Sequence, residues 1–283
     1  MESLKLGILG LDSTHFDAFY KIIKSTKIQL DIFYLFDESN KVKKTRVSEY
    51  PELKIFFNND PDKCDCFMVL NRFGEDHLKA FERIVSFGKP TFIDKPISNN
   101  FQNASKIFKL AKDHNTPITS HSPLEFSDEF YEAQSIYKEI ITSKQKTAII
   151  FSGPSECNDL GDDPRLKNAL FYGIHLSEML SSLISEKAID KIEKISNTND
   201  QRTTISFKNG EVSFFIDLYS EGSEFYNITF YNNIMGHKSI DIKLDGSYYD
   251  KFVSHLIGFF QQRAHIKPSK KSLNAMKILN EAI

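Results

Sequence analysis

The chain has 283 residues, of which 40% are hydrophobic and 26% are charged, so it can bury a large core without disulfides or metals. Its formal net charge is −2, and it has no basic stripe of the kind found in nucleic-acid-binding proteins. It also has no apolar segment long enough to span a membrane and no signal-peptide pattern at its N-terminus. We therefore expect a cytoplasmic protein that binds neither nucleic acid nor membrane.

Cysteine and histidine give no sign of a disulfide framework or a metal site. The three cysteines, Cys64, Cys66 and Cys157, are few and odd in number, as expected in a reducing compartment. The eight histidines are scattered and lack ligand spacings such as H-x-H or H-E-x-x-H. We expect no bound metal, which makes a metal-dependent hydrolase the least favoured class of enzyme.

The first 121 residues alternate apolar runs with amphipathic stretches, which is typical of a parallel α/β sheet. The predicted strands cover Leu4–Leu9, Gln29–Phe36, Cys66–Leu70, Pro90–Asp94 and Pro117–Ser120. The predicted helices cover His15–Lys24, His77–Phe87 and Phe101–Asp113. This order predicts a Rossmann-type dinucleotide-binding domain over residues 1–121.

From residue 122 to residue 283 the pattern predicts an α+β domain with a mainly antiparallel, open sheet. The predicted strands cover Thr147–Ser152, Lys191–Ser196, Thr203–Phe207, Glu211–Tyr219, Phe225–Tyr231 and Lys238–Leu244. The predicted helices cover Ser127–Ile141, Asn168–Leu183, Tyr248–Arg263 and Ser269–Ala282. Asn209-Gly210 predicts a tight hairpin turn between two of these strands. We expect this domain to bind the substrate and to mediate self-association.

The first strand ends in a turn that could hold a phosphate at a helix N-terminus. Its sequence, Gly10-Leu11-Asp12-Ser13-Thr14-His15, keeps only the first glycine of G-x-G-x-x-G. Asp12 takes the place of the second glycine, where an acidic side chain would crowd and repel the phosphates. The hydroxyls of Ser13 and Thr14 could bind a phosphate instead, or the turn could be a capped βα turn that binds no nucleotide.

Asp37, at the end of the second predicted strand, favours nucleotide binding and NAD over NADP. An acidic side chain at this position accepts hydrogen bonds from the ribose hydroxyls and repels a 2′-phosphate. The alternative is a surface aspartate that closes a strand.

The segment from Cys66 to Ser98, CFMVLNRFGEDHLKAFERIVSFGKPTFIDKPIS, resembles the Gfo/Idh/MocA family of NAD(P)-dependent oxidoreductases. The matching landmarks are His77 at a helix start, Gly88-Lys89 at a helix end, and Asp94-Lys95-Pro96 in place of the family's E-K-P. The resemblance implies that Lys95 lies beside the nicotinamide and the substrate, where its ammonium can stabilise a developing alkoxide. We expect these residues to bind the cofactor: Gly10, Asp12, Ser13, Thr14, Asp37, Asn71, His77, Asp94, Lys95 and Pro96.

A later landmark of the family is a helix that reads D-x-G-x-H-x-x-D, in which the histidine is the general acid/base. Here His175 matches that histidine and Glu178 matches the later acid, but Phe171 replaces the first aspartate. The resemblance therefore implies that Lys95 and His175 are catalytic while one acid is missing. It also extends to Tyr248–Ile283, and so implies that the last helix packs on the first domain. Candidates for a replacement proton relay are Tyr172 and the preceding loop acids, Glu156, Asp159, Asp162 and Asp163.

Two functions follow from these observations. The first is an NAD-dependent enzyme that oxidises or reduces a sugar, a polyol or a related small hydroxylated metabolite, with His15, Tyr172 and Glu178 as further substrate-site candidates. The second is a sensory or regulatory relative that binds a dinucleotide or sugar without turning it over, which the departures at Asp12, His15 and Phe171 favour. Alternating apolar residues on the later strands (Phe214, Ile216 and Leu218) lead us to expect a homodimer or homotetramer.

Overall fold

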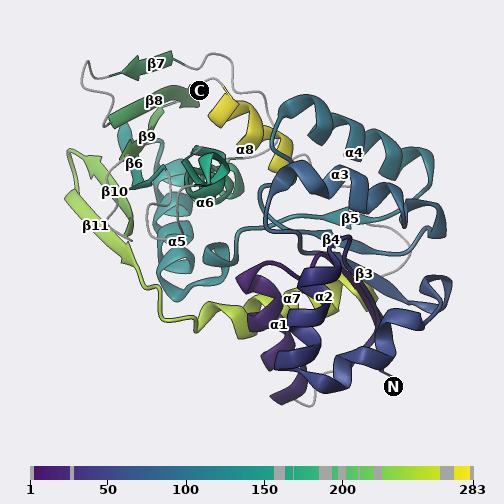
Figure 1. Ribbon diagram of the computed structural model, residues 1–283. Helices are drawn as coiled ribbons and strands as arrows, with labels where there is room; N and C mark the ends of the chain where they lie inside the picture. Colours follow the sequence, from purple (N-terminus) through teal and green to yellow (C-terminus); the bar gives the residue numbers. More distant parts are fainter. Residues whose placement is uncertain are drawn as a thin grey trace. The chain divides into compact units, whose positions relative to one another are not determined.

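A computed structural model gives the fold of the chain (Figure 1). It describes residues 3–25, 29–155, 163–167, 169–184, 193–196, 202–209, 211–219, 225–261 and 271–280. The chain divides into two compact units, Met1–Ser120 with Tyr249–Ser269, and His121–Tyr248 with Lys270–Ile283. Several residues named above lie outside the described residues: Cys157, Glu156, Asp159, Asp162 and Gly210, and the predicted element bounds Asn168, Lys191, Arg263, Ser269 and Ala282.

The first unit is built on a five-stranded parallel sheet in the order β2-β1-β3-β4-β5. Its strands are β1 (Leu4–Leu9), β2 (Leu30–Phe36), β3 (Cys66–Val69), β4 (Thr91–Ile93) and β5 (Ile118–Thr119). Every residue of β3 and β4 is buried, as expected for a sheet covered on both faces. The strand order reverses between β1 and β3, and ligands of such sheets bind at the carboxyl ends of the strands beside that point.

Helices that present an apolar stripe at helical spacing cover this sheet, whereas one helix of this unit, Asn40–Glu49, buries none of its residues. The α-helices are α1 (Thr14–Ser25), α2 (Asn40–Glu49), α3 (Gly74–Glu82), α4 (Phe101–Asp113) and α7 (Tyr248–Gln261), and the 3₁₀ turns are η1 (Pro51–Asn58), η2 (Pro61–Lys63) and η3 (Val85–Phe87). Phe19 of α1, Phe92 of β4 and Phe252 of α7 contact one another, with ring centroids 5.4–6.2 Å apart. Helices α1 and α7 therefore pack on the same face of the sheet, while α3 and α4 are neighbours of each other.

The second unit is built on a six-stranded sheet in the order β11-β10-β6-β9-β8-β7. Its strands are β6 (Thr147–Pro154), β7 (Glu193–Ser196), β8 (Arg202–Asn209), β9 (Val212–Tyr219), β10 (Tyr226–Asn232) and β11 (Gly236–Ile242). The sheet is mainly antiparallel, as predicted, but its central pair, β6 and β9, is parallel. Consecutive short connections could not reveal this parallel pair, because β6 and β9 are distant in sequence.

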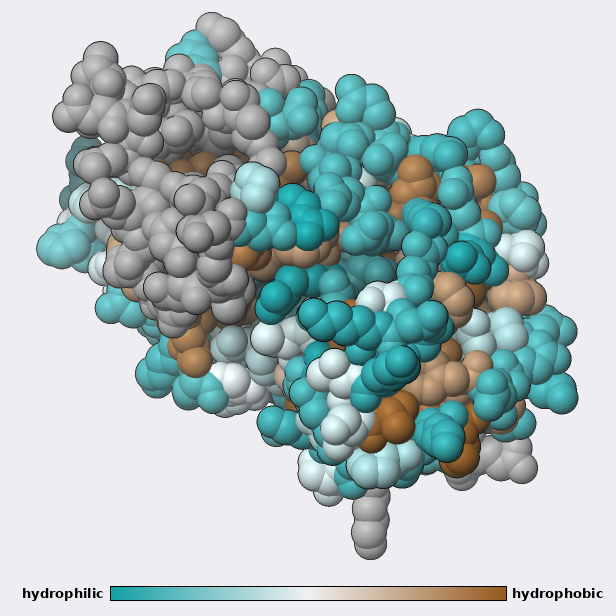
Figure 2. Space-filling view, in the orientation of Figure 1, coloured by the Kyte–Doolittle hydropathy of each residue, from teal (hydrophilic) through white to brown (hydrophobic). Residues whose placement is uncertain are grey.

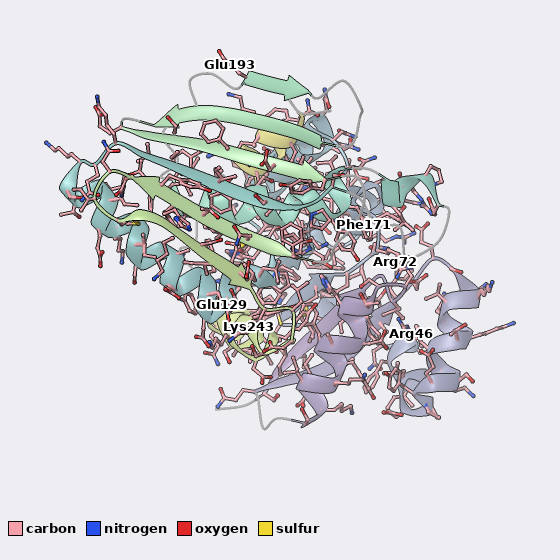
Figure 3. All side chains as sticks on the ribbon, turned by 90° about the vertical axis from the view of Figure 1, so that its left-hand side faces the viewer. Arg46, Arg72, Glu129, Phe171, Glu193 and Lys243 are labelled. Atoms are coloured by element: carbon pink, nitrogen blue, oxygen red, sulfur yellow. The ribbon has the colours of Figure 1, made fainter. Side chains whose placement is uncertain are left out.

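Three helices, α5 (Asp128–Ser143), α6 (Ala169–Leu183) and α8 (Lys271–Asn280), belong to this unit, with the 3₁₀ turns η4 (Pro123–Phe126) and η5 (Pro164–Lys167). Helix α6 packs on the sheet and on α8. We expected the last helix to pack on the first domain. The helix that belongs to the first unit is instead α7, while the last helix, α8, belongs to the second unit and packs on α6. Ion pairs also join α5 to the β11 region, for example Lys243 Nζ to Glu129 Oε1 at 3.2 Å (Figure 3).

The surface gives limited support to the expected self-association. Phe214, Ile216 and Leu218, which led us to expect it, are buried within the chain itself, with exposed fractions of 2% or less. The face seen in Figure 2 is mostly hydrophilic, with hydrophobic side chains in small separate groups. The oligomeric state therefore stays a prediction. Within the described ranges, no helix combines the length and the apolar character that crossing a membrane requires.

Candidate functional site

The turn between β1 and α1 is shaped by Gly10 and closed by Asp37. Gly10 has a φ of 83°, in the left-handed region that favours glycine, and a Cβ at this position would lie 2.3 Å from the backbone nitrogen of Asn71. The Asp37 carboxylate accepts the N–H groups of Leu11 and Ser39, each at 2.8 Å. Burial raises the pKa of Asp37 despite these two donors. Each carboxylate oxygen has a second lone pair with which it can accept a ligand hydroxyl.

Arg46 of α2 orients the peptide groups of the turn. Its Nε donates to the carbonyl oxygen of Leu11 at 2.6 Å, and its second terminal nitrogen donates to that of Ser13 at 3.2 Å. In a planar trans peptide the N–H points opposite to the C=O, so the N–H groups of Asp12 and Thr14 point away from Arg46. Neither N–H has a hydrogen-bond partner among the described residues. Both are available to a ligand beside the N-terminus of α1.

The side chains of the turn are largely committed to the protein. Asp12 Oδ1 accepts the backbone N–H of Arg72 at 3.0 Å, which joins this turn to the β3–α3 loop. Ser13 Oγ accepts the N–H of Phe16 at 3.3 Å, as an N-cap of α1 does. Thr14 is the exposed hydroxyl of the turn. Of the two hydroxyls that we expected to bind phosphate, Thr14 is therefore the more accessible.

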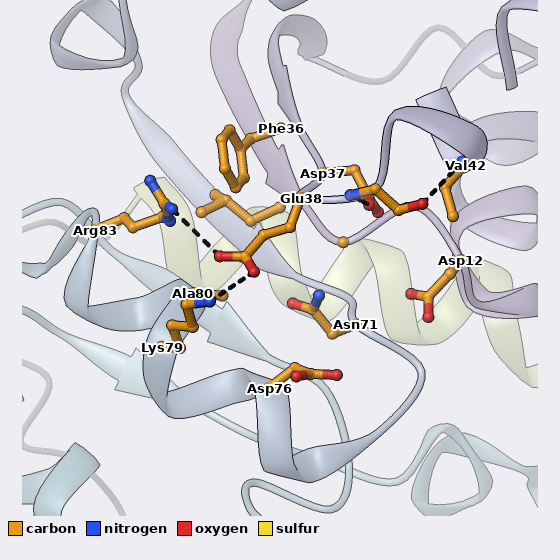
Figure 4. A pocket seen from close by; sticks show the side chains of 13 residues that line it. Asp12, Phe36, Asp37, Glu38, Val42, Asn71, Asp76, Lys79, Ala80 and Arg83 are labelled. Carbon is orange, nitrogen blue, oxygen red and sulfur yellow. Dashed lines mark hydrogen bonds and ion pairs between the residues drawn. The ribbon is translucent and has the colours of Figure 1, made fainter. Parts of the chain in front are cut away.

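A pocket opens beside this turn, at the carboxyl ends of β1 and β2 (Figure 4). Asp12, Asp37 and Asn71 line it, and Glu38 at its edge pairs with Lys79 at 2.6 Å and Arg83 at 3.2 Å. The Oδ1 atom of Asn71 is buried and has no hydrogen-bond partner within the described chain. A buried acceptor of this kind needs a donor, which a ligand hydroxyl or amino group can supply. The pocket therefore offers the acceptors of Asp37 and Asn71 to a ligand that carries hydroxyl or amino groups.

His15 and Asp94 form a pair beside Lys95. His15 Nδ1 lies 2.6 Å from Asp94 Oδ2, and Asp94 Oδ1 accepts the backbone N–H of Lys95 at 2.8 Å. Burial alone would raise the pKa of Asp94, but His15 and Lys95 outweigh it and hold that pKa below its ordinary value. His15, which the family pattern did not explain, thus anchors the residue that precedes Lys95.

His77 holds the same region from the other side. Its Nε2 lies 2.8 Å from the carbonyl oxygen of Asn71, and its Nδ1 lies 2.9 Å from that of Pro96. The ring is completely buried, so it can act on a cofactor only through these two backbone groups. The start of α3 fits tightly here, because a Cβ on Gly74 would lie 2.9 Å from Pro96. His77 therefore fixes the loop that carries Lys95, which is itself only 9% exposed.

In the second unit, His175 lies on α6 against the residue that precedes η4. Its Nδ1 is 2.6 Å from the hydroxyl oxygen of Ser122, and both side chains are buried. The ring of Tyr226 meets the His175 ring edge-on at 5.4 Å, and the Tyr226 hydroxyl donates to the Tyr172 carbonyl oxygen at 3.5 Å. Phe171 is half-buried and its ring contacts that of Tyr172 (labelled in Figure 3).

Glu178 lies in a buried charge cluster with Lys271 and Glu125. Lys271 Nζ is 2.9 Å from Glu178 Oε2 and 2.6 Å from Glu125 Oε1. Burial raises the pKa of Glu178 to about 7, against the attraction of Lys271 and with the repulsion of Glu125. For Glu125, the nearby Lys271 and His121 charges outweigh burial and lower the pKa. Glu178, a substrate-site candidate, is 0% exposed.

The raised pKa of Glu178 predicts a pH-dependent loss of stability. Between its ordinary value of 4.5 and about 7, the folded protein holds a proton that the unfolded chain releases. The contribution of this group to the free energy of unfolding therefore falls as pH rises through that window. Glu178→Gln mimics the protonated form. We expect its free energy of unfolding to match that of the wild type near pH 4.5 and to exceed it above about pH 7. Denaturant unfolding across pH measures this difference, and a difference that does not change with pH would contradict it.

Sequence reasoning missed several residues of these sites, among them Arg46, Ser122 and Lys271. Only Ser122 had a local signal, because Ser122-Pro123-Leu124-Glu125 fits the capping-box pattern S-x-x-E, and that box is present at η4. Asp163, one of the candidate relay acids, pairs with Arg165 at 2.6 Å. Nowhere in the described ranges do three or more His, Cys, Asp or Glu side chains gather as a metal site would require.

No protein-family model and no curated protein sequence matches the chain. Solved structures match along its whole length. GenD2 from gentamicin A biosynthesis, solved with NAD, has a TM-score of 0.76 at 11% identity, over 100% of this chain and 93% of its own. A Gfo/Idh/MocA family oxidoreductase from Vibrio cholerae has a TM-score of 0.72 at 14% identity, over 99% and 96%.

An oxidoreductase from Agrobacterium radiobacter, solved with NAD⁺, L-tartaric acid and magnesium, has a TM-score of 0.73 at 13% identity, over 99% of this chain and 95% of its own. These identities are low, but the three likenesses each cover both units together with the parallel sheet and the second, mainly antiparallel sheet. This chain therefore has the fold of the Gfo/Idh/MocA family oxidoreductases.

Proposed function

We propose that the protein is an NAD-dependent oxidoreductase that acts on a sugar, a polyol or a related small hydroxylated metabolite. The observation that carries the proposal is the fixed position of Lys95 at the carboxyl end of β4. Both of its neighbours in the sequence are held by histidines. His15 pairs with Asp94, and His77 lies within hydrogen-bond distance of the Pro96 carbonyl oxygen. A lysine fixed at this edge of a parallel sheet is suited to a ligand that binds there. Solved neighbours were obtained with NAD or with NADP⁺, which supports a nicotinamide dinucleotide as the cofactor.

Different residues of the chain would have different roles in such a reaction. A bound nicotinamide dinucleotide would supply or accept the hydride. The Lys95 ammonium would stabilise negative charge that develops on the substrate oxygen. His175, which matches the histidine of the family pattern, would act on the substrate as a hydrogen-bond donor. Asp37 and Asn71 would hold the adenosine ribose, and the N–H groups of Asp12 and Thr14 would receive the phosphates.

Asp37 predicts a preference for NAD over NADP. Its carboxylate lies at the end of β2, in the pocket, where a 2′-phosphate would meet a second negative charge. Calorimetric titration should give tighter binding of NAD⁺ than of NADP⁺. Asp37→Asn should narrow that preference, because it removes the charge and keeps most of the shape. Asp31→Asn, an exposed carboxylate on the same strand, is the matched control and should not change it. Tighter binding of NADP⁺ by the wild type would show that Asp37 does not face the ribose.

The reaction itself is tested by adding NAD⁺ and a panel of sugars, polyols and hydroxy acids to the purified protein. We expect NADH to form with at least one of them, and the reverse reaction to consume NADH with the corresponding carbonyl compound. Dinucleotide binding without turnover of any of these substrates would contradict the enzymatic proposal.

The second candidate function is a non-catalytic relative that binds a dinucleotide or a sugar. It is favoured by Phe171, an apolar side chain one helical turn before His175, where the family pattern has an acid. This candidate predicts ligand binding without hydride transfer, so binding and turnover assays on the same preparation separate the two. We also propose a cytoplasmic location, which the buried free thiols of Cys64 and Cys66 support.

A homodimer or homotetramer stays part of the proposal. Sedimentation at micromolar concentration would measure the oligomeric state, and a monomer would contradict this part of the proposal.

A further inference from the structure

We propose that Ser122 fixes the tautomer of His175, so that the neutral imidazole carries its proton on Nε2. The hydroxyl oxygen of Ser122 lies 2.6 Å from Nδ1 of His175, which is a short hydrogen bond between two buried groups. A hydroxyl can donate or accept at such a distance, so the direction follows from the other bonds that Ser122 makes.

The second partner of the Ser122 hydroxyl is a donor. Its oxygen accepts the backbone N–H of Leu124 at 3.2 Å, because Ser122 is the N-cap of η4. Within the described chain the hydroxyl makes hydrogen bonds only with this N–H and with the His175 ring. A buried hydroxyl hydrogen needs an acceptor, and His175 Nδ1 is the one available. Ser122 therefore donates, Nδ1 keeps its lone pair, and the ring proton of neutral His175 lies on Nε2.

The capping box holds Ser122 in this role. Its backbone N–H donates to Glu125 Oε1 at 2.8 Å, and that carboxylate is paired with Lys271. Lys271 also pairs with Glu178, which lies three residues after His175 on the same helix. The backbone that carries the hydroxyl and the helix that carries the imidazole are thus joined through one buried ammonium. This connection holds the Ser122 hydroxyl within hydrogen-bond distance of the His175 ring.

His15 provides the opposite case in the same chain. Its Nδ1 faces Asp94 at 2.6 Å, and the pKa of that carboxyl is lowered, so the carboxylate can only accept. The neutral His15 ring must therefore carry its proton on Nδ1. The two histidines are expected to show opposite tautomers, which makes His15 an internal reference for His175.

The catalytic consequence rests on the proposed function. A neutral His175 with a proton on Nε2 offers a hydrogen bond to the substrate oxygen and has no lone pair there with which to take up a proton. Its role in that form is to stabilise an oxyanion, as a neutral imidazole does when its other nitrogen is fixed as an acceptor. Ser122 is then a positioning residue for this donor.

The test is ¹⁵N nuclear magnetic resonance of the full chain labelled at histidine, at a pH where the rings are neutral and with neither substrate nor cofactor added. His175→Gln and His15→Gln assign the two signals. We expect the Nε2–H tautomer for His175 and the Nδ1–H tautomer for His15. Ser122→Thr, which keeps the hydroxyl and the cap, should preserve the His175 pattern, and Ser122→Ala should shift it toward Nδ1–H or a mixture. Ser143→Ala, an exposed serine at the end of α5, should leave it unchanged.

An Nδ1–H tautomer of His175 in the wild type would overturn the inference, even if Ser122→Ala fails to fold. An unchanged His175 pattern in a folded Ser122→Ala protein would overturn the role of Ser122. Neither result depends on turnover. Observing the expected tautomer in a protein without oxidoreductase activity would therefore reject the proposed function and keep this inference.

Discussion

Lys271→Met should lower the free energy of unfolding by about 3–5 kcal/mol, the usual cost of removing one partner from a buried ion pair. Burial alone would lower the pKa of Lys271, but its two carboxylates raise that pKa on balance, so the ammonium stays charged in the folded protein. Without it, Glu125 and Glu178 would be two buried carboxylates with no cation between them. Denaturant unfolding followed by circular dichroism at neutral pH measures the loss.

Lys277→Met is the matched control for this prediction. Lys277 lies on the same helix and is exposed, so the same substitution there should change the free energy of unfolding by less than about 0.5 kcal/mol. Glu178→Gln combined with Lys271→Met should recover part of the loss, because one of the two uncompensated carboxylates is then removed. Equal stabilities for the two lysine variants would contradict the buried charge cluster.

His175→Ala should lower turnover by about 10²- to 10³-fold, the range typical of a lost hydrogen-bond donor to a developing oxyanion. Lys95→Ala should lower it by roughly 10²-fold or more, as the loss of a single electrostatic stabiliser does. Both should act mainly on kcat, because these interactions strengthen as negative charge develops on the substrate oxygen. Steady-state kinetics with the substrate that gives the highest activity in the panel measure both effects.

Two exposed residues provide controls for these variants. His237→Ala in β11 and Lys112→Ala in α4 replace the same residue types on the surface of the same units, and both should retain turnover. Each active-site variant should also keep its unfolding midpoint within a few degrees, which separates lost chemistry from lost folding. If His175→Ala and Lys95→Ala both leave turnover unchanged, the assignment of the active site is wrong.

The regular elements could largely be predicted because local patterns decide them. The predicted helix Phe101–Asp113 agrees with α4 at both ends, since Asn100 caps its first turn and a stripe of small and aliphatic residues faces the core. Strands such as Leu4–Leu9 read as buried runs and formed as such. Helix α2 was missed because none of its residues is buried, so it has no apolar stripe for a pattern to detect.

The candidate site depends on contacts between residues that are far apart in sequence, and these could not be predicted. Arg46 shapes the turn between β1 and α1 from 35 residues away, through its hydrogen bond to the carbonyl oxygen of Leu11. His15 meets Asp94 across 79 residues, so neither side chain signals the other locally. Lys271 lies 146 residues after Glu125. The resemblance located Lys95 and His175 by their motifs, whereas the groups that hold them came only from the fold.

The most direct test of the account is mass spectrometry of the small molecules released when the purified, full-length protein is denatured, with calorimetric titration of the same preparation by NADH. The account predicts that NAD⁺ or NADH is released, or that NADH binds at one site per chain. Gly10→Val should abolish that binding, because its side chain would collide with the backbone of Asn71. If no dinucleotide is released and neither NADH nor NADPH binds, the turn after β1 does not hold a nucleotide and the central claim is wrong.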